Sequence, residues 1–356
     1  MRGDYNRRAM KILVLKRDKI GDLLLTTPLL ARLKAALPQA EVHLLANDYN
    51  AWVAAGNKHV DRLWIYRRVR RAGRISLSAA WEWIWQGRAL RRERYDWVIV
   101  ANGDESPRAI RRALSLRGTR TVARCAGASK YPGLTDPVAP DAAGHEIERL
   151  LALLVPLGIP LATENPFPTY KLPETSSAFA GRWLSERNLS PGSYIVLGLG
   201  ARRAKKQPST VQVLAWSSQF KRQWGLDTVF MWTPGKSGDP LYPGDDDTAT
   251  PVVEAAARGR APQIQPFRGP IPEALGLIWH ARLSLFPDSG LMHFAAASPG
   301  GVLGFFAETE LSPAPAQWAP RGARADYLEA AKSVSELPEA LVYERVGLLL
   351  SGRLSL

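Results

Sequence analysis

Cysteine is almost absent from this chain of 356 residues, which contains only Cys125. One thiol cannot form an intramolecular disulfide and excludes a zinc site built on cysteines, so we expect a reducing compartment and a packing role for Cys125. Long apolar runs are also lacking. No window approaches the roughly 18 residues of a membrane span, and the apolar run near the N-terminus is too short for a secretory signal. We therefore expect a cytoplasmic protein.

Acidic residues are scarce in the first part of the chain. Residues 1–150 hold 28 Lys and Arg against 15 Asp and Glu, whereas the remainder holds 19 against 18. The net charge of +14 therefore lies almost wholly in the first half. Its densest parts are residues 67–74 and 88–94, with Trp81, Trp83 and Trp85 between them.

Basic clusters interleaved with tryptophan favour an anionic membrane surface or an anionic glycolipid. Each Lys or Arg near anionic headgroups gains about 1 kcal/mol, and Trp prefers the interface. Nucleic acid would respond to the same charge. A solvated helix face with the tryptophans packed inward is the structural alternative.

Helix and strand patterns alternate along the chain, which predicts parallel sheets covered by helices. In the first half we expect strands at 11–15, 41–45, 62–66, 97–101 and 121–123, and helices at 27–36, 78–92 and 145–157. Strands are expected again at 194–197, 228–232, 282–286 and 301–306, followed or preceded by helices that include residues 291–297.

The length is more than one core usually fills, and four prolines between residues 159 and 173 indicate a linker. We predict an α/β protein with two Rossmann-like domains, residues 1–165 and 166–356, facing each other across a central cleft. The last helix could pack back on the first domain. No sequence repeat relates the halves.

Two carboxylates follow predicted strands and precede helix starts, Asp22 in the first half and Asp288 in the second. Ligands of open α/β sheets bind beyond the carboxyl ends of the strands, so each carboxylate is expected to point toward the crevice. In the second half, the backbone amides of Ser289, Gly290 and Leu291 start a helix, where unpaired N–H groups and the helix dipole favour phosphate.

A diphosphate site is the simplest interpretation of the second half. His293 lies one helical turn beyond Ser289 and could donate to the same phosphate. The Gly-rich turn 198–201, which includes Gly200, supplies further amides. Four cations follow it: Arg202, Arg203, Lys205 and Lys206.

In this order, these residues resemble glycosyltransferase family 9, the ADP-heptose:lipopolysaccharide heptosyltransferases. The resemblance covers roughly residues 10 to 322. Its first signature is the run 17–28, Arg-Asp-Lys-Ile-Gly-Asp-Leu-Leu-Leu-Thr-Thr-Pro, and its second is the run 288–297, Asp-Ser-Gly-Leu-Met-His-Phe-Ala-Ala-Ala. Residues 145–149 match the interdomain helix, and residues 205–208 match a Lys-Arg-Trp-Pro loop.

The resemblance implies a GT-B fold and inverting transfer from a nucleotide sugar, ADP-heptose above all, to a lipopolysaccharide core or similar anionic acceptor. No metal or cofactor is expected. Asp22 would be the general base and Lys205 would stabilise the leaving diphosphate. The other donor-binding residues would be Gly200, Lys206, Asp288, Ser289, Gly290, Leu291 and His293. The expected acceptor-binding residues are Arg17, Lys19, Gly21, Arg67, Arg68, Arg70 and Arg71.

Three segments differ from the family pattern, and in the first of them, residues 100–103, the family's Asp-x-Gln-Gly reads Val-Ala-Asn-Gly. Most members carry Gly-Pro-Thr-Asp-Pro after the last strand, whereas residues 307–310 read Ala-Glu-Thr-Glu, which would place Glu308 near the donor phosphates. Gln207 replaces the Trp of the basic loop. The acidic run 245–247 is interpreted as a solvated loop rather than a metal site.

The expected partners are a nucleotide sugar, an anionic glycolipid and the inner face of the cytoplasmic membrane, with no nucleic acid. A non-catalytic protein that binds nucleotide sugar or nucleic acid with the same fold is the alternative.

Overall fold

The computed structural model describes residues 8–68, 70–71, 74–75, 77–140, 144–200, 204–239, 244–310 and 314–353. The chain divides into two compact units, Met1–Lys171 and Leu172–Leu356. This division falls inside the Pro-rich segment 159–173, in which the sequence predicts a linker.

The first unit is built on a six-stranded parallel sheet with the strand order β3-β2-β1-β6-β7-β8. The strands are β1 (Lys11–Leu15), β2 (Glu41–Asn47), β3 (Arg62–Tyr66), β6 (Trp97–Val100), β7 (Arg120–Arg124) and β8 (Asp136–Val138). The short strands β4 (Arg70–Arg71) and β5 (Arg74–Ile75) form a separate antiparallel pair. The helices are α1 (Ile20–Leu24), α2 (Thr27–Ala36), α3 (Leu77–Arg92), α4 (Pro107–Ser115) and α5 (Glu146–Leu151), with 3-10 turns η1 (Ala51–Ala54), η2 (Ala128–Lys130) and η3 (Ala152–Leu157).

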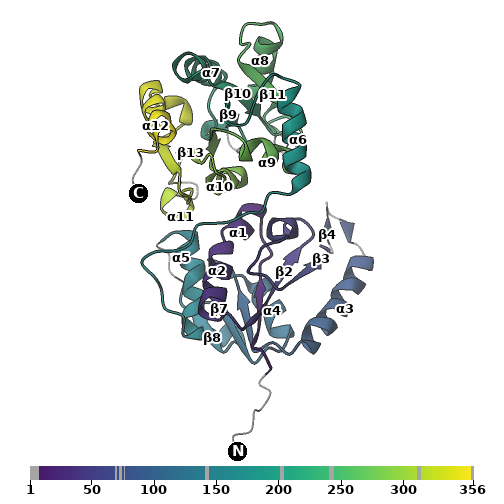
Figure 1. Cartoon of the computed structure of the whole chain (residues 1–356). Coiled ribbons are helices and arrows are strands. Elements are labelled where there is room, and N and C mark those ends of the chain that lie inside the picture. The colour runs from purple at the N-terminus through teal and green to yellow at the C-terminus, as the bar shows by residue number, and fades with distance from the viewer. Residues whose placement is uncertain are drawn as a thin grey trace, which may run out of the picture. The chain divides into compact units, whose positions relative to one another are not determined.

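The central strand β1 is apolar on both faces because helices cover both sides of a doubly wound sheet. Its residues 12–15 are completely buried. The neighbouring helices α2 and α5 lie side by side, and α3 lies beside the edge strand β3 (Figure 1). The expected helix at 145–157 is instead α5 followed by the 3-10 turn η3, which contains Pro156. Proline lacks the N–H that an α-helix would need at that position.

The second unit repeats the architecture, with the order β11-β10-β9-β12-β13-β14 in another parallel sheet. Its strands are β9 (Tyr194–Gly198), β10 (Asp227–Met231), β11 (Ile264–Phe267), β12 (Leu283–Pro287), β13 (Val302–Ala307) and β14 (Ala325–Ala330). Its helices are α6 (Glu174–Ser185), α7 (Thr210–Trp224), α8 (Asp246–Ala257), α9 (Ile271–Trp279), α10 (Gly290–Ala296), α11 (Pro315–Trp318) and α12 (Glu339–Ser351), with turns η4 (Ala204–Lys206) and η5 (Val334–Glu336).

Sequence signals at both ends explain where α7 forms. Ser209 accepts a hydrogen bond from the Gln212 amide and Gln212 accepts one from the Ser209 amide, which is a reciprocal capping box. Gly225 ends the helix at φ 69°, a left-handed conformation that glycine adopts without strain. The last helix, α12, packs against α7 and β14, and its Val342, Val346 and Leu349 belong to the core of the second unit.

Both sheets have the 3-2-1-4-5-6 order of a dinucleotide-binding fold, in which the chain reverses direction of progress between the first and fourth strands. The reversal lies between β1 and β6 in one unit and between β9 and β12 in the other. The predicted α/β fold with two Rossmann-like domains is therefore confirmed. The two reversal points are where ligand-binding groups are expected.

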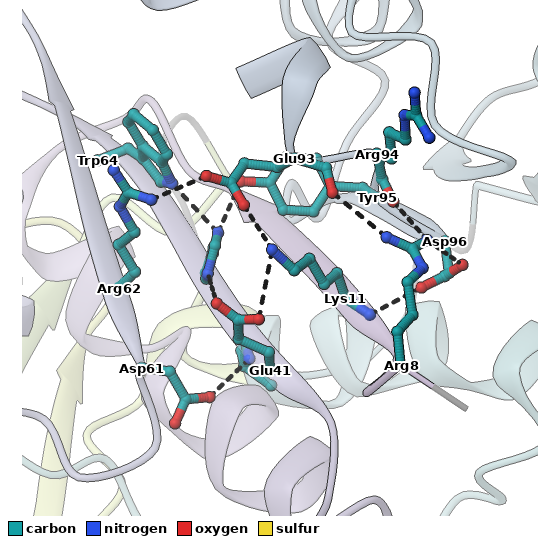
Figure 2. A network of polar contacts seen from close by, with 12 residues as sticks. Arg8, Lys11, Glu41, Asp61, Arg62, Trp64, Glu93, Arg94, Tyr95 and Asp96 are labelled. Carbon is teal, nitrogen blue, oxygen red and sulfur yellow. Dashed lines mark hydrogen bonds and ion pairs between the residues drawn. The ribbon is translucent and has the colours of Figure 1, made fainter. Parts of the chain in front are cut away.

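A network of charged groups lies at the amino end of the strands of the first sheet, opposite the reversal point (Figure 2). Lys11 contacts Glu93 at 2.6 Å, and Glu93 also pairs with Arg62 at 2.8 Å. The buried His43 ring contacts Tyr95 Oη and Glu41 Oε1, each at 2.7 Å. These contacts join β1, β2 and β3 to the segment before β6, so this edge has a structural role.

Candidate active site

Asp22 lies beyond the carboxyl end of β1, in the first turn of α1. The chain leaves β1 at Leu15, and α1 begins at Ile20. The amide of the exposed Lys19 donates to Asp22 Oδ2 at 3.0 Å. In the described part of the chain Oδ1 accepts no hydrogen bond, so one carboxylate oxygen is available to a substrate hydroxyl. Gly21 is buried at the same turn, as its place in the signature requires.

Lys16 and Asp18 form an ion pair beside Asp22. Lys16 is only 1% exposed, and its Nζ lies 3.1 Å from Asp18 Oδ2. Asn102, which follows β6, donates to the same Asp18 oxygen at 2.5 Å. The Asp18 carboxylate is thereby held at the reversal point between β1 and β6.

Burial raises the pKa of Asp22, and the Asp18 carboxylate raises it further, while Lys16 and Lys19 act in the opposite direction. A general base works best when its pKa lies near the working pH, so the shift favours Asp22 as a proton acceptor. Lys16 and Asn102 were not expected from the sequence. A lysine directly after a fully apolar strand is the signal that could have indicated the first.

Two arginines, Arg17 and Arg112, lie near one another in the first unit. Arg17 donates to Tyr66 Oη at 2.9 Å. Arg112 of α4 is 8% exposed and stacks 3.9 Å from the Trp83 ring centroid, and its Nη2 makes no hydrogen bond within the described residues. Burial, helped by the charge of Arg17, lowers the pKa of Arg112 to about 10. A buried guanidinium that has no carboxylate partner among the described residues is suited to bind an anion.

Arg112 was not expected from the sequence either. It follows Ala109 and Ile110 and precedes Ala113, all of them buried, so the signal was a cation on the apolar face of α4. Of the predicted acceptor arginines, Arg67 pairs with Glu82 at 3.0 Å and Arg68 with Asp48 at 2.9 Å.

For the remaining predicted acceptor arginines, Arg70 and Arg71, the structure describes only the backbone, which forms the strand β4.

In the second unit, Asp288 follows β12 and forms a buried ion pair with Lys206. Lys206 Nζ lies 2.9 Å from Asp288 Oδ2, and the side chains are 7% and 17% exposed. Ser289 is the N-cap of α10, and its Oγ is buried without a hydrogen bond in the described residues. Gly200 lies next to it, because a Cβ there would come within 3.9 Å of Ser289 Oγ. Gly200, Asp288, Ser289 and Lys206 therefore meet at the reversal point between β9 and β12.

Lys205 points in a different direction from Lys206. Its side chain is 65% exposed and pairs with Glu308 at 3.1 Å. Glu308 follows β13 at φ 54°, in the left-handed region that non-glycine residues rarely adopt. The carboxylate expected near the phosphates therefore contacts the lysine predicted to stabilise them. Arg202 and Arg203 lie outside the described residues.

His293 is a buried, neutral imidazole. Burial lowers its pKa to about 4 against a smaller opposing effect of Asp288. Its Nδ1 has no hydrogen-bond partner in the described chain. Gly290 and Leu291 start α10 one turn earlier.

The interpretation of residues 245–247 as a solvated loop is wrong for Asp245 and Asp246, whereas Asp247 is exposed. Asp245 is buried, accepts hydrogen bonds from Gln207 and from the Thr233 amide, and precedes α8, of which Asp246 is the first residue. Asp246 accepts from Trp232 Nε1 at 2.9 Å. The run braces the segment after β10 because its carboxylates satisfy backbone and side-chain donors.

The described residues contain neither a metal-binding cluster nor a membrane-spanning helix. No group of three or more His, Cys, Asp or Glu is arranged to hold a metal ion there. None of the helices in the described ranges is long and apolar enough to cross a membrane.

Two Rossmann-type units with polar groups at both reversal points have the architecture of the GT-B fold. The sequence model of glycosyltransferase family 9 (heptosyltransferase) matches residues 84–336. The chain belongs to glycosyltransferase family 9 and is a glycosyltransferase.

The similar proteins match this chain over 82% to 97% of its length. Lipopolysaccharide heptosyltransferase 3 of Escherichia coli is 24% identical over 294 residues, covering 82% of this chain and 81% of the relative. A family 9 glycosyl transferase from Veillonella parvula superposes with a TM-score of 0.77 at 18% identity, covering 96% of this chain and 97% of the other. The ADP-heptose lipopolysaccharide heptosyltransferase II of E. coli gives 0.74 at 20% identity, with 97% and 99% coverage.

Proposed function

We propose that this enzyme is an inverting, metal-independent heptosyltransferase that moves a heptose from ADP-heptose to a lipopolysaccharide core or a similar anionic glycan. Family membership and the names of the relatives support the substrates. The solved structures of heptosyltransferase WaaC of E. coli, with ADP and with ADP-2-deoxy-2-fluoro heptose, have TM-scores of 0.72 and 0.69 to this chain.

The position of Asp22 carries the proposal. Oδ2 is fixed by the Lys19 amide, and Oδ1 is available to an acceptor hydroxyl. As the hydroxyl oxygen bonds to the anomeric carbon, Asp22 accepts the proton and the bond from that carbon to the diphosphate oxygen breaks, which releases ADP. Attack opposite the leaving group inverts the configuration. The pair of Lys16 and Asp18 is a positioning element for this turn.

The second unit would bind the donor. The buried Lys206 and Asp288 fix the start of α10, whose Ser289, Gly290 and Leu291 amides would bind a phosphate. The exposed Lys205 is free to exchange Glu308 for the leaving diphosphate, where a positive charge stabilises the negative charge that develops. His293, being neutral, would donate one hydrogen bond rather than a charge.

The acceptor would lie against the first unit. Arg17 and Arg112 offer two cations to phosphate or carboxylate groups, and Arg67 and Arg68 offer two more if their carboxylate partners release them. Because a lipopolysaccharide precursor is lipid-anchored, we place the enzyme at the inner face of the cytoplasmic membrane as a peripheral protein.

Nucleotide release from ADP-heptose in the presence of a core acceptor tests the proposal. Asp22→Asn should lower kcat about 10²- to 10⁴-fold, the usual contribution of a general base, with ADP affinity unchanged. Asp61→Asn, which alters a carboxylate at the amino edge of the same sheet, is the matched control and should retain activity. Chelator should leave the rate unchanged. Full activity of Asp22→Asn would refute the proposed base.

A further inference from the structure

The outer face of α3 carries exposed aromatic side chains. All five residues 81–85 are exposed, with Trp81 at 63%, Trp85 at 60% and Ile84 at 43%. Successive helical residues are about 100° apart, so Trp81, Ile84 and Trp85 share one face, and Arg88 and Arg92 continue that face toward the end of the helix. Large apolar groups gathered on one exposed face indicate an interaction surface.

The opposite face of α3 is fixed to the protein. Leu90 is fully buried, and Gln86 donates to the Ile65 carbonyl of β3 at 2.7 Å. Trp83 stacks on Arg112, and Arg91 donates to the Ser115 carbonyl at 2.6 Å. Because these contacts set the rotation of the helix, Trp81 and Trp85 cannot turn inward. The alternative in which all three tryptophans pack inward is therefore wrong.

The charge on the outer face of α3, which carries Trp81 and Trp85, is positive. Arg88 stacks 5.2 Å from the ring centroid of the exposed Trp85, and Arg92 is exposed at the end of the helix. The one acidic residue of α3, Glu82, is paired with Arg67. Tryptophan beside arginine on a helix that lies along the surface matches the chemistry of an anionic lipid interface, which accepts the rings at headgroup depth and attracts the cations.

We propose that Trp81, Ile84 and Trp85 insert into the headgroup region of an anionic bilayer while Arg88 and Arg92 contact its phosphates. This rests on the proposed function, because the same helix touches Arg112 through Trp83, next to the cations proposed for the acceptor. Docking by α3 would hold those cations at the membrane surface where a lipid-anchored acceptor lies.

Co-sedimentation of the full chain with vesicles tests this inference. We expect binding to phosphatidylcholine vesicles that contain phosphatidylglycerol, weaker binding to phosphatidylcholine alone, and loss with added salt. Trp81→Ala/Trp85→Ala should weaken binding at least about tenfold, because the variant lacks the two rings that would move from water into the partly apolar headgroup region. Arg88→Gln/Arg92→Gln should weaken it about 25-fold, at about fivefold per arginine.

Matched controls are Leu161→Ala/Val211→Ala, which removes two comparably exposed apolar side chains, and Arg258→Gln, which removes an exposed arginine. Both should bind like the unaltered protein. Unchanged melting temperatures would show that the variants are folded.

Vesicle binding that does not change with the content of anionic lipid or with the α3 substitutions would overturn the inference. Self-association that the tryptophan variant abolishes, without vesicle binding, would overturn it in favour of a protein interface. Vesicle binding requires no donor, so it is measured independently of transfer. If the protein transfers sugar to a soluble acceptor but its α3 variants still bind vesicles, the role of α3 in docking is refuted and the proposed function stands.

Discussion

Among the described ion pairs of the second unit, Lys206 and Asp288 should be the most costly to break. At 2.9 Å, their attraction is about 6 kcal/mol at an effective dielectric constant of about 20, and the burial of both groups opposes it. Removing one partner of a buried pair costs about 3 to 5 kcal/mol. Since Asp288 retains some exposure to water, we expect Lys206→Met to cost about 3 kcal/mol, at the lower end.

Urea denaturation of the full chain, with hydrogen exchange at β9 and β12 to report the second unit, measures this cost. The control is Lys221→Met, because Lys221 pairs with Asp227 in the same unit at 2.8 Å but is 47% exposed. Exposed pairs contribute about 0 to 1 kcal/mol, so the control should be nearly neutral.

The double variant Lys206→Met/Asp288→Asn tests whether the cost of the single variants comes from leaving one charge buried without its partner. It should recover about 2 kcal/mol relative to the sum of the single variants, because neither charge is left buried alone. Equal costs for Lys206→Met and Lys221→Met, or no coupling between Lys206 and Asp288, would refute the reasoning.

Three further predictions concern pH and packing. Asp18→Asn should move the acid limb of kcat/KM to lower pH, because losing the Asp18 charge and freeing Lys16 both lower the pKa of Asp22; an unmoved limb argues against Asp22 as the titrating base. The pKa values of Glu41 and Glu93 are lowered by hydrogen bonds to His43 and Lys11, so their stabilisation should be present above the unfolded pKa of about 4.3 and be lost as pH falls through the folded values. Acid titration of unfolding should therefore show a shallower loss in Glu93→Gln, and an identical profile would contradict the network's role. Gly198→Ala should destabilise by about 1 to 3 kcal/mol, since its Cβ would lie 2.0 Å from Phe286 Cε1, whereas Gly181→Ala, with open space in α6, should stabilise by up to about 1 kcal/mol in urea denaturation.

Much of the fold could be predicted from the sequence because its central strands are continuous apolar runs. The bounds of the central strand β1 agree with the expected residues 11–15, and those of the edge strand β3 agree with 62–66 because its Leu-Trp-Ile-Tyr run favours a strand. The strands β8, β11 and β14 were missed, and each lies at the edge of its sheet. Edge strands tolerate proline and polar residues, as Pro137 in β8 and Pro266 in β11 illustrate. Local patterns therefore identify apolar strands better than edge strands that contain proline or polar residues.

The candidate site was predicted less completely, for a reason that the adjacent lysines make clear. Sequence alone treats Lys205 and Lys206 as equal cations of one loop, and the resemblance assigns the leaving group to Lys205. In the structure, both lysines lie in the 3-10 turn η4, where Lys206 is buried against Asp288 while Lys205 remains exposed beside Glu308. Which of two neighbours faces the core depends on strands β12 and β13, which are remote in sequence. The same long-range dependence hid Arg112, whose neighbours Trp83 and Arg17 come from α3 and the turn after β1. A residue's identity thus indicates what chemistry it can perform, but the sheet order decides which residue is placed to perform it.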